Sequence, residues 1–169
     1  LVGFVYLTIN NCRTPIECRQ YGFGSYAVGG SSSRVRPNDR EIVMCRFTFY
    51  LGAPIRLDSL LLEPAHSLIR QSSHSLERAE PLNGDGFGVG WYAQGHSPMP
   101  AVFRSITPAW NNRNLHNLAR VVASDCVMAH VRAVSRSSVV NDANCHPFRY
   151  HVLLCMHNGD IGEFKKARR

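Results

Sequence analysis

The pattern of apolar and polar positions predicts a domain that begins at about Met44. From there on, short apolar runs alternate with turn residues, which is typical of strands and short helices. The predicted strands are residues 45–51, 86–92, 101–106, 127–134 and 151–156. The first predicted helix is residues 58–62, with Asp58 as its cap. The second is residues 112–124, and a third begins at residue 160. The strands outnumber the helices and the connections are short, so antiparallel sheets are expected.

Residues 1–43 have a different character. Residues 22–40 form a Gly/Ser-rich run followed by Arg and Pro, and no apolar periodicity develops across them. We therefore expect residues 1–43 to be a disordered upstream extension or a propeptide, and residues 44–169 to form the domain.

Charge and cysteine content narrow the classes of function. The chain of 169 residues has a net charge of +7, but four of its positive charges lie in the last five residues. A terminal basic cluster of this kind is typical of a solvated helix face, so nucleic-acid binding is not expected. The longest apolar run, residues 1–9, is too short to cross a bilayer, so no membrane partner is expected.

The six cysteines form no CxxC pair, and the chain has no glycosylation sequon, which favours a reducing, cytoplasmic location. The Cys145-His146 and Cys155-Met156-His157 clusters lack the usual spacing of zinc ligands, so no metal site is expected.

Four segments combine residues that could carry chemistry. In NGDGFGVGWY, residues 83–92, a glycine stands at every second position, so one face of the strand lacks side chains and can admit a ligand or another backbone. Arg132 lies in an apolar strand and has either a structural ion pair or a substrate carboxylate as its partner. Asn158-Gly159 is either a simple turn or a pair of oxyanion donors, and His146 is either structural or a base.

The order of these segments is more specific than any one of them. The sequence MCRF, EPLNGDGFGVGWY, FRSITPAWNNRNL, AHVRAVS, NCHPF and MHNGDIG resembles the class II glutamine amidotransferases. Within that family it is similar to the subgroup of stand-alone amidotransferase-like proteins and γ-glutamyl hydrolases. The resemblance implies an α+β fold of the N-terminal-nucleophile (Ntn) hydrolase type, an αββα sandwich of antiparallel sheets, which we expect to be truncated here at the C-terminus.

The resemblance also implies roles for individual residues. Removal of Met44 would expose Cys45 as the nucleophile, with its own α-amine as the base, and a γ-glutamyl thioester would form. Asn158 and Gly159 match the oxyanion hole, and Arg132 matches the residue that grips the α-carboxylate of the glutamyl group. The same family likeness places Asp85, Gly86 and Ser135 at the substrate and leaves His146 structural.

No cofactor is implied. The implied substrate is glutamine or a γ-glutamyl peptide of glutathione- or ergothioneine-related metabolism, and a synthase or hydrolase subunit is a possible partner. An inactive partner subunit that keeps the fold is the alternative.

Two departures from the family bear on activity. The acidic residue that relatives use to bind the substrate's ammonium group is expected beyond residue 169, so we expect this chain alone to be inactive. Residues 1–43 would acylate the Cys45 amine. They are either a propeptide or, as we prefer, an upstream sequence that the native protein lacks.

Overall fold

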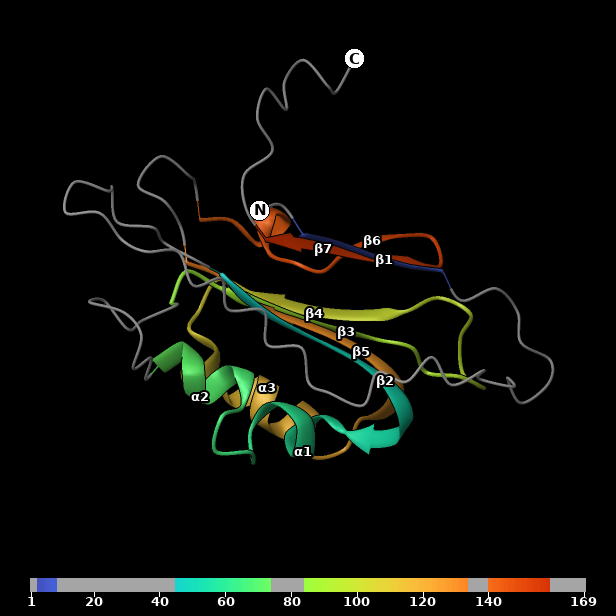
Figure 1. Cartoon of the computed structure of the whole chain (residues 1–169), viewed down its shortest axis with the longest axis horizontal. Helices are drawn as coiled ribbons and strands as arrows, with labels where there is room; N and C mark the ends of the chain where they lie inside the picture. Colours follow the sequence, from blue (N-terminus) through green and yellow to red (C-terminus); the bar gives the residue numbers. More distant parts are fainter. Residues whose placement is uncertain (1–2, 9–44, 74–83, 134–139, 159–169) are drawn as a thin grey trace, which may run out of the picture.

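The computed structural model describes residues 3–8, 45–73, 84–133 and 140–158, which form two stacked antiparallel sheets and a layer of short helices (Figure 1). The first sheet has the strand order β2-β5-β3-β4, and the second has the order β1-β7-β6. The strands are β1 (Gly3–Thr8), β2 (Arg46–Arg56), β3 (Phe87–Trp91), β4 (Ala101–Ser105), β5 (Ala123–Val131), β6 (Phe148–Tyr150) and β7 (Leu153–Asn158). The helices are α1 (Leu57–Leu61), α2 (Leu68–Ser73) and α3 (Arg113–Ala119), with 3₁₀ turns η1 (Ala109–Asn111) and η2 (Asp142–Asn144). The predicted α+β class with antiparallel sheets is confirmed.

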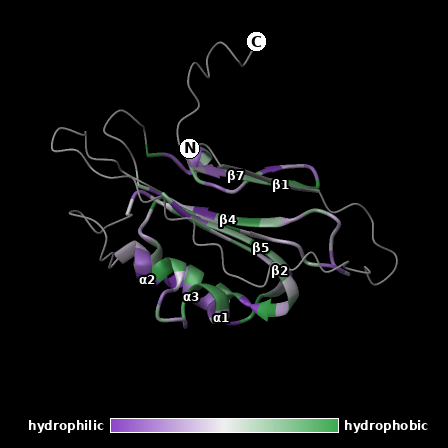
Figure 2. Ribbon diagram, in the orientation of Figure 1, coloured by the Kyte–Doolittle hydropathy of each residue, from purple (hydrophilic) through white to green (hydrophobic). Residues whose placement is uncertain are grey.

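Strand β5 lies in the middle of the molecule and is buried on both faces. Val127, Ala129 and Val131 pack into the core beneath the helices. The alternate residues Cys126 and Met128 pack against β7 of the second sheet. This two-sided burial explains the nearly continuous apolar sequence of β5. The helices need only one apolar face, and Figure 2 shows hydrophobic and hydrophilic residues side by side in them.

Helix α3 is shorter than predicted. It begins where expected, because the Asn112 side chain accepts a hydrogen bond of 2.8 Å from the Leu115 N–H. It ends at Ala119, before the predicted end at residue 124. The Val122 carbonyl instead accepts a bond of 3.0 Å from the Leu57 N–H, and Ala123 already pairs with Arg56 of β2. Pairing with a distant strand thus overrides the local helical spacing.

Strand β2 continues past its predicted end at Leu51 and through Gly52, Ala53 and Pro54. Its pairing with β5 is interrupted between Leu51 and Ile55 and then resumes to Arg56. An edge strand tolerates Pro54 at such an irregularity, because the missing N–H is not needed for the ladder.

In α1, Asp58 is not the N-cap as predicted. Arg56 holds that position, and the Asp58 carboxylate accepts hydrogen bonds from Arg56 Nε at 3.0 Å and from Ser59 N at 2.8 Å.

Some elements are new relative to the sequence prediction. Helix α2 and strand β6 were not predicted, and β1 lies within the segment expected to be disordered. Strand β1 pairs antiparallel with β7, with Gly3 opposite Asn158, so the expectation of disorder does not hold for these six residues. An apolar run gains main-chain partners along the edge of β7 in this way. The expected helix from residue 160 lies outside the described residues.

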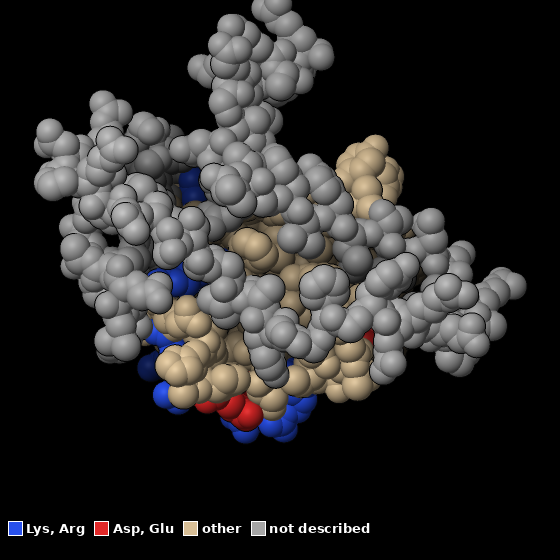
Figure 3. Space-filling view, viewed as in Figure 1, with Lys and Arg blue, Asp and Glu red and all other residues tan. Residues whose placement is uncertain are grey.

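Charges of both signs lie next to each other at the helical side of the molecule (Figure 3). Arg56 makes ion pairs there with Asp58 at 3.0 Å and with Glu63 at 3.6 Å. Within the described ranges, no helix is long and apolar enough to cross a bilayer.

Candidate functional site

Three strand ends bring predicted site residues to one edge of the first sheet. Cys45 directly precedes β2, Gly86 directly precedes β3, and Arg132 directly follows β5. Because β2 and β3 both pair antiparallel with β5, Arg46 and Phe87 both lie opposite Val131. The three predicted residues therefore occupy neighbouring positions at the same edge.

Main-chain and thiol contacts hold this edge together. The Ala133 N–H donates to Cys45 Sγ at 3.5 Å, and the thiol lies 3.5 Å from the Ala133 carbonyl oxygen. The Arg132 N–H donates to the Gly86 carbonyl at 2.8 Å, and the Asp85 N–H donates to the Arg132 carbonyl at 3.2 Å. Arg132 is only 9% exposed, whereas Cys45 is half-buried. A half-buried cysteine and a buried arginine thus lie at neighbouring positions of this edge.

Alternate glycines just before and within β3, which we call the glycine track (Gly86, Gly88 and Gly90), admit a backbone segment. A Cβ on Gly86 would lie 2.8 Å from Cys145 Sγ, and one on Gly90 would lie 2.7 Å from Pro147 Cγ. A Cβ on Gly88 would overlap the His146 carbonyl oxygen. The sequence left open whether this bare face admits a ligand or a backbone, and in the structure it admits residues 145–147. Gly86 also has φ +109°, which favours glycine.

A cluster of three histidines, which we call the histidine cluster (His130, His146 and His157), joins the two sheets. The His146 ring centroid lies 4.5 Å from that of His130 on β5 and 4.5 Å from that of His157 on β7. Burial, helped by the neighbouring histidines, lowers the pKa of His130 to about 3. Burial, together with the nearby His157, Arg132 and Arg104, lowers the pKa of His146 to about 4. Both imidazoles are therefore neutral at neutral pH.

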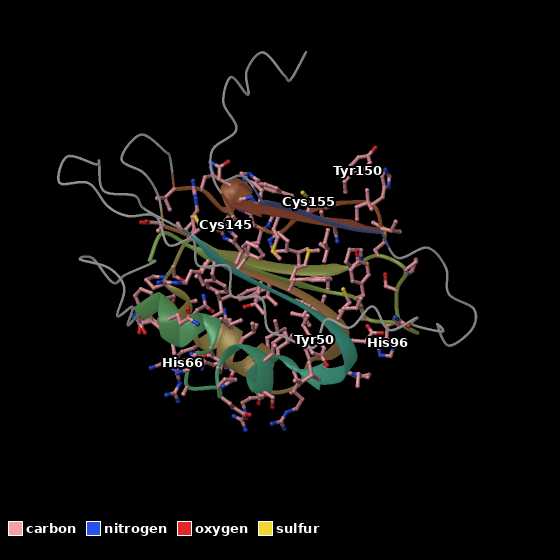
Figure 4. All side chains as sticks on the ribbon, in the orientation of Figure 1. Tyr50, His66, His96, Cys145, Tyr150 and Cys155 are labelled. Carbon is pink, nitrogen blue, oxygen red and sulfur yellow. The ribbon has the colours of Figure 1, made fainter. Side chains whose placement is uncertain are left out.

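Burial acts on the thiols of the three described cysteines other than Cys45. Burial raises the pKa of Cys126 to about 12 and raises the pKa values of Cys145 and Cys155. Because the thiolate is the reactive species, these three thiols are poorly suited to attack a carbonyl. Figure 4 shows Cys145 and Cys155 on the side of the second sheet, with His66 among the helices on the opposite side.

The remaining predicted residues are only partly covered by the structure. Asn158 is the last residue of β7, and its side chain is not described. Gly159 and Ser135 lie outside the described residues. The roles of all the predicted site residues stay predictions. The sequence analysis missed His130, although it lies in β5 only two positions before Arg132.

No group of three or more His, Cys, Asp or Glu side chains in the described segments has the geometry to hold a metal ion. In the histidine cluster, the rings of His146 and His157 meet edge to face at 89°.

Comparison with known proteins places this chain in a family. The family described as "Glutamine amidotransferases class-II" matches residues 69–169. The chain belongs to the class II glutamine amidotransferase family. The resemblance inferred from the motifs is thereby confirmed. The family match includes the glycine track, Arg132 and Asn158, while Cys45 lies ahead of it.

Two curated relatives of this chain extend the comparison. The chain is 52% identical over 133 residues to "Probable glutamine amidotransferase DUG3" of Saccharomyces cerevisiae, covering 75% of this chain and 37% of the relative. It is 32% identical over 120 residues to "Gamma-glutamyl-hercynylcysteine sulfoxide hydrolase" of Mycobacterium tuberculosis, covering 70% and 50% respectively. A solved class II domain protein from Silicibacter pomeroyi is 27% identical, with a TM-score of 0.39, over 62% of this chain and 32% of that one. The chain thus spans half or less of the length of these relatives.

Proposed function

We propose that this protein hydrolyses the amide bond of glutamine or of a γ-glutamyl compound, with Cys45 as the nucleophile. The observation that carries the proposal is the shared edge where Cys45, Gly86 and Arg132 meet in a member of the class II amidotransferase family. The two sheets and the helices on one face support an Ntn-hydrolase fold. They would form three of the four layers of that αββα sandwich.

Cys45 would act in a chain from which Met44 and everything before it have been removed. A free α-amine titrates near neutral pH and can accept the proton of the thiol on the same residue. The sulfur then attacks the side-chain carbonyl, a tetrahedral oxyanion forms, and loss of ammonia or an amine leaves a γ-glutamyl thioester that water hydrolyses. The Ala133 N–H, 3.5 Å from the sulfur, is placed to favour negative charge there.

The other groups would bind the glutamyl unit. Arg132 would pair with its α-carboxylate by a two-pronged contact that only a guanidinium offers. Asn158 and Gly159 would donate to the oxyanion, and loss of one such donor typically costs about 10²–10³ in rate. Asp85 and Ser135 would line the pocket. These assignments rest on the family likeness together with the position of Arg132 beside Cys45 and Gly86.

Two substrate classes compete within this proposal. The yeast relative is named a glutamine amidotransferase, and the mycobacterial relative is named a γ-glutamyl hydrolase. We propose a γ-glutamyl compound as the alternative substrate to glutamine. The reaction would take place in the cytoplasm, and a synthase or hydrolase subunit would be a further partner. An inactive subunit that keeps the fold is the competing hypothesis.

The proposal is tested on the full-length protein expressed from Met44. Glutamate release is measured from glutamine and from several γ-glutamyl peptides, and mass spectrometry checks that Cys45 is the first residue. Cys45→Ala should abolish release, whereas Cys155→Ala, a half-buried thiol on β7, serves as the matched control and should not. Equal release by the wild type and Cys45→Ala would refute the assignment. A wild type with a free Cys45 that releases nothing from any of these compounds would favour the inactive subunit.

A further inference from the structure

His146 stands between the two sheets, close to the elements that carry the proposed oxyanion and carboxylate sites. Its ring centroid lies 4.5 Å from that of His130 on β5, two positions before Arg132, which directly follows this strand. Its ring also lies 4.5 Å from His157, the residue next to Asn158 on β7. One side chain therefore touches both strands whose ends carry proposed site residues.

The backbone of His146 is fixed by the glycine track. Its carbonyl occupies the space that a side chain at Gly88 would fill, and Pro147 occupies the space beside Gly90. Arg104 Nη1 also donates to the neighbouring Cys145 carbonyl at 3.4 Å. With its backbone seated on β3, the imidazole has little freedom and acts as a spacer of defined thickness between β5 and β7.

The His146 ring contacts its neighbours by packing and not by hydrogen bonds from its nitrogens. Neither ring nitrogen of His146 has a hydrogen-bond partner among the described residues, and the residue is only 8% exposed. Besides the two histidines, the Phe148 ring lies 4.4 Å away. Packing of flat rings against one another contributes about 0.5–1.5 kcal/mol per pair in general, so three such contacts can fix a separation.

We propose that His146 is a positioning residue, whose ring sets the separation of β5 and β7 and thereby places the Asn158 end of β7 relative to Cys45 and Arg132. The catalytic part of this inference rests on the proposed function. The sequence reading treated His146 as structural only, whereas the packing links it to the geometry of the site.

Charged and titratable neighbours define the conditions under which the spacer works. His130 on β5, His157 on β7, Arg132 after β5 and Arg104 on β4 all act on the His146 imidazole or its partners. A proton on His146 would add a third positive charge beside the two arginines. The spacer is therefore expected to keep its geometry in the neutral state.

The test replaces His146 by Ala and by Phe in the naturally processed full-length protein. His146→Ala should lower kcat about 100-fold with KM changed less than about threefold, because displacing reacting groups by about 1 Å costs roughly this factor. His146→Phe keeps a flat ring without nitrogens and should stay within about fivefold of wild-type kcat, since shape carries the proposal. His116→Ala, in α3 on the helical side, is the control and should match the wild type.

A second readout does not depend on catalysis. The Asn158 and Arg132 amide resonances are followed by NMR in the same variants, and both should shift in His146→Ala and return towards wild-type positions in His146→Phe. Equal kcat in the Ala variant and the wild type, or rescue by His146→Gln but not by Phe, would overturn the proposal. If the wild type itself releases no glutamate, the proposed function fails and the resonances alone decide: unshifted Asn158 and Arg132 signals in His146→Ala overturn the positioning role.

Discussion

Acidification should destabilise this protein through its histidine cluster. The unfolded chain titrates its histidines near ~6.5, whereas the pKa values in the folded state are about 3 for His130 and about 4 for His146. Between these values the unfolded chain binds more protons than the folded one. The free energy of unfolding is therefore fully maintained above pH 6.5 and falls as the pH drops below it.

The magnitude follows from the size of the pH step. Each histidine that protonates only on unfolding contributes about 1.4 kcal/mol per pH unit, so the step from pH 6.5 to pH 5 removes about 2 kcal/mol for each. His130 and His146 together therefore remove about 4 kcal/mol at pH 5. That is a large share of the ~5–15 kcal/mol that a typical domain has in total.

Urea unfolding followed by circular dichroism at pH 7, 6 and 5 measures this loss. His146→Phe removes one of the two groups, so its loss between pH 7 and pH 5 should be about 2 kcal/mol smaller than that of the wild type. His116→Ala, at an exposed position, corrects for general effects of removing a histidine. The reasoning is refuted if the wild type and His146→Phe lose the same free energy between pH 7 and pH 5.

Two further predictions concern the glycine track and the carboxylate site. Gly88→Ala places a Cβ against the His146 carbonyl, a backbone atom that cannot rotate away, so the free energy of unfolding should fall by about 1–3 kcal/mol. Thermal unfolding checks this against Gly84→Ala, whose Cβ would meet Trp110 at an ordinary 3.4 Å; equal midpoints would contradict the packing argument. Arg132→Lys should raise KM for γ-glutamyl substrates about 10- to 100-fold, because a charge-assisted hydrogen bond is worth roughly 1.5–3 kcal/mol. Steady-state kinetics measures it, and an unchanged KM would remove Arg132 from substrate binding.

Much of the fold could be predicted from local patterns. The strands over 87–91 and 101–105 agree closely with those predicted, and the Asn112 cap begins α3 where expected. The ends of other elements could not be predicted, because pairing partners far along the chain decide them. Residues 123 and 124 lie inside the predicted helix 112–124, yet they pair with β2, which continues beyond its irregularity at Leu51–Ile55.

The sequence by itself determined the family, through the order of its motifs, and nominated Cys45, Arg132 and Asn158. It also showed that one face of β3 is bare, since alternate glycines remove every side chain from that face. Only the tertiary structure decided what fills this face. It also gathered His130, His146 and His157 from three separate segments into one cluster, in which His130 and His146 are buried. The physical reason is that periodicity reports which face of an element is apolar, whereas burial and pKa depend on which distant element packs against that face.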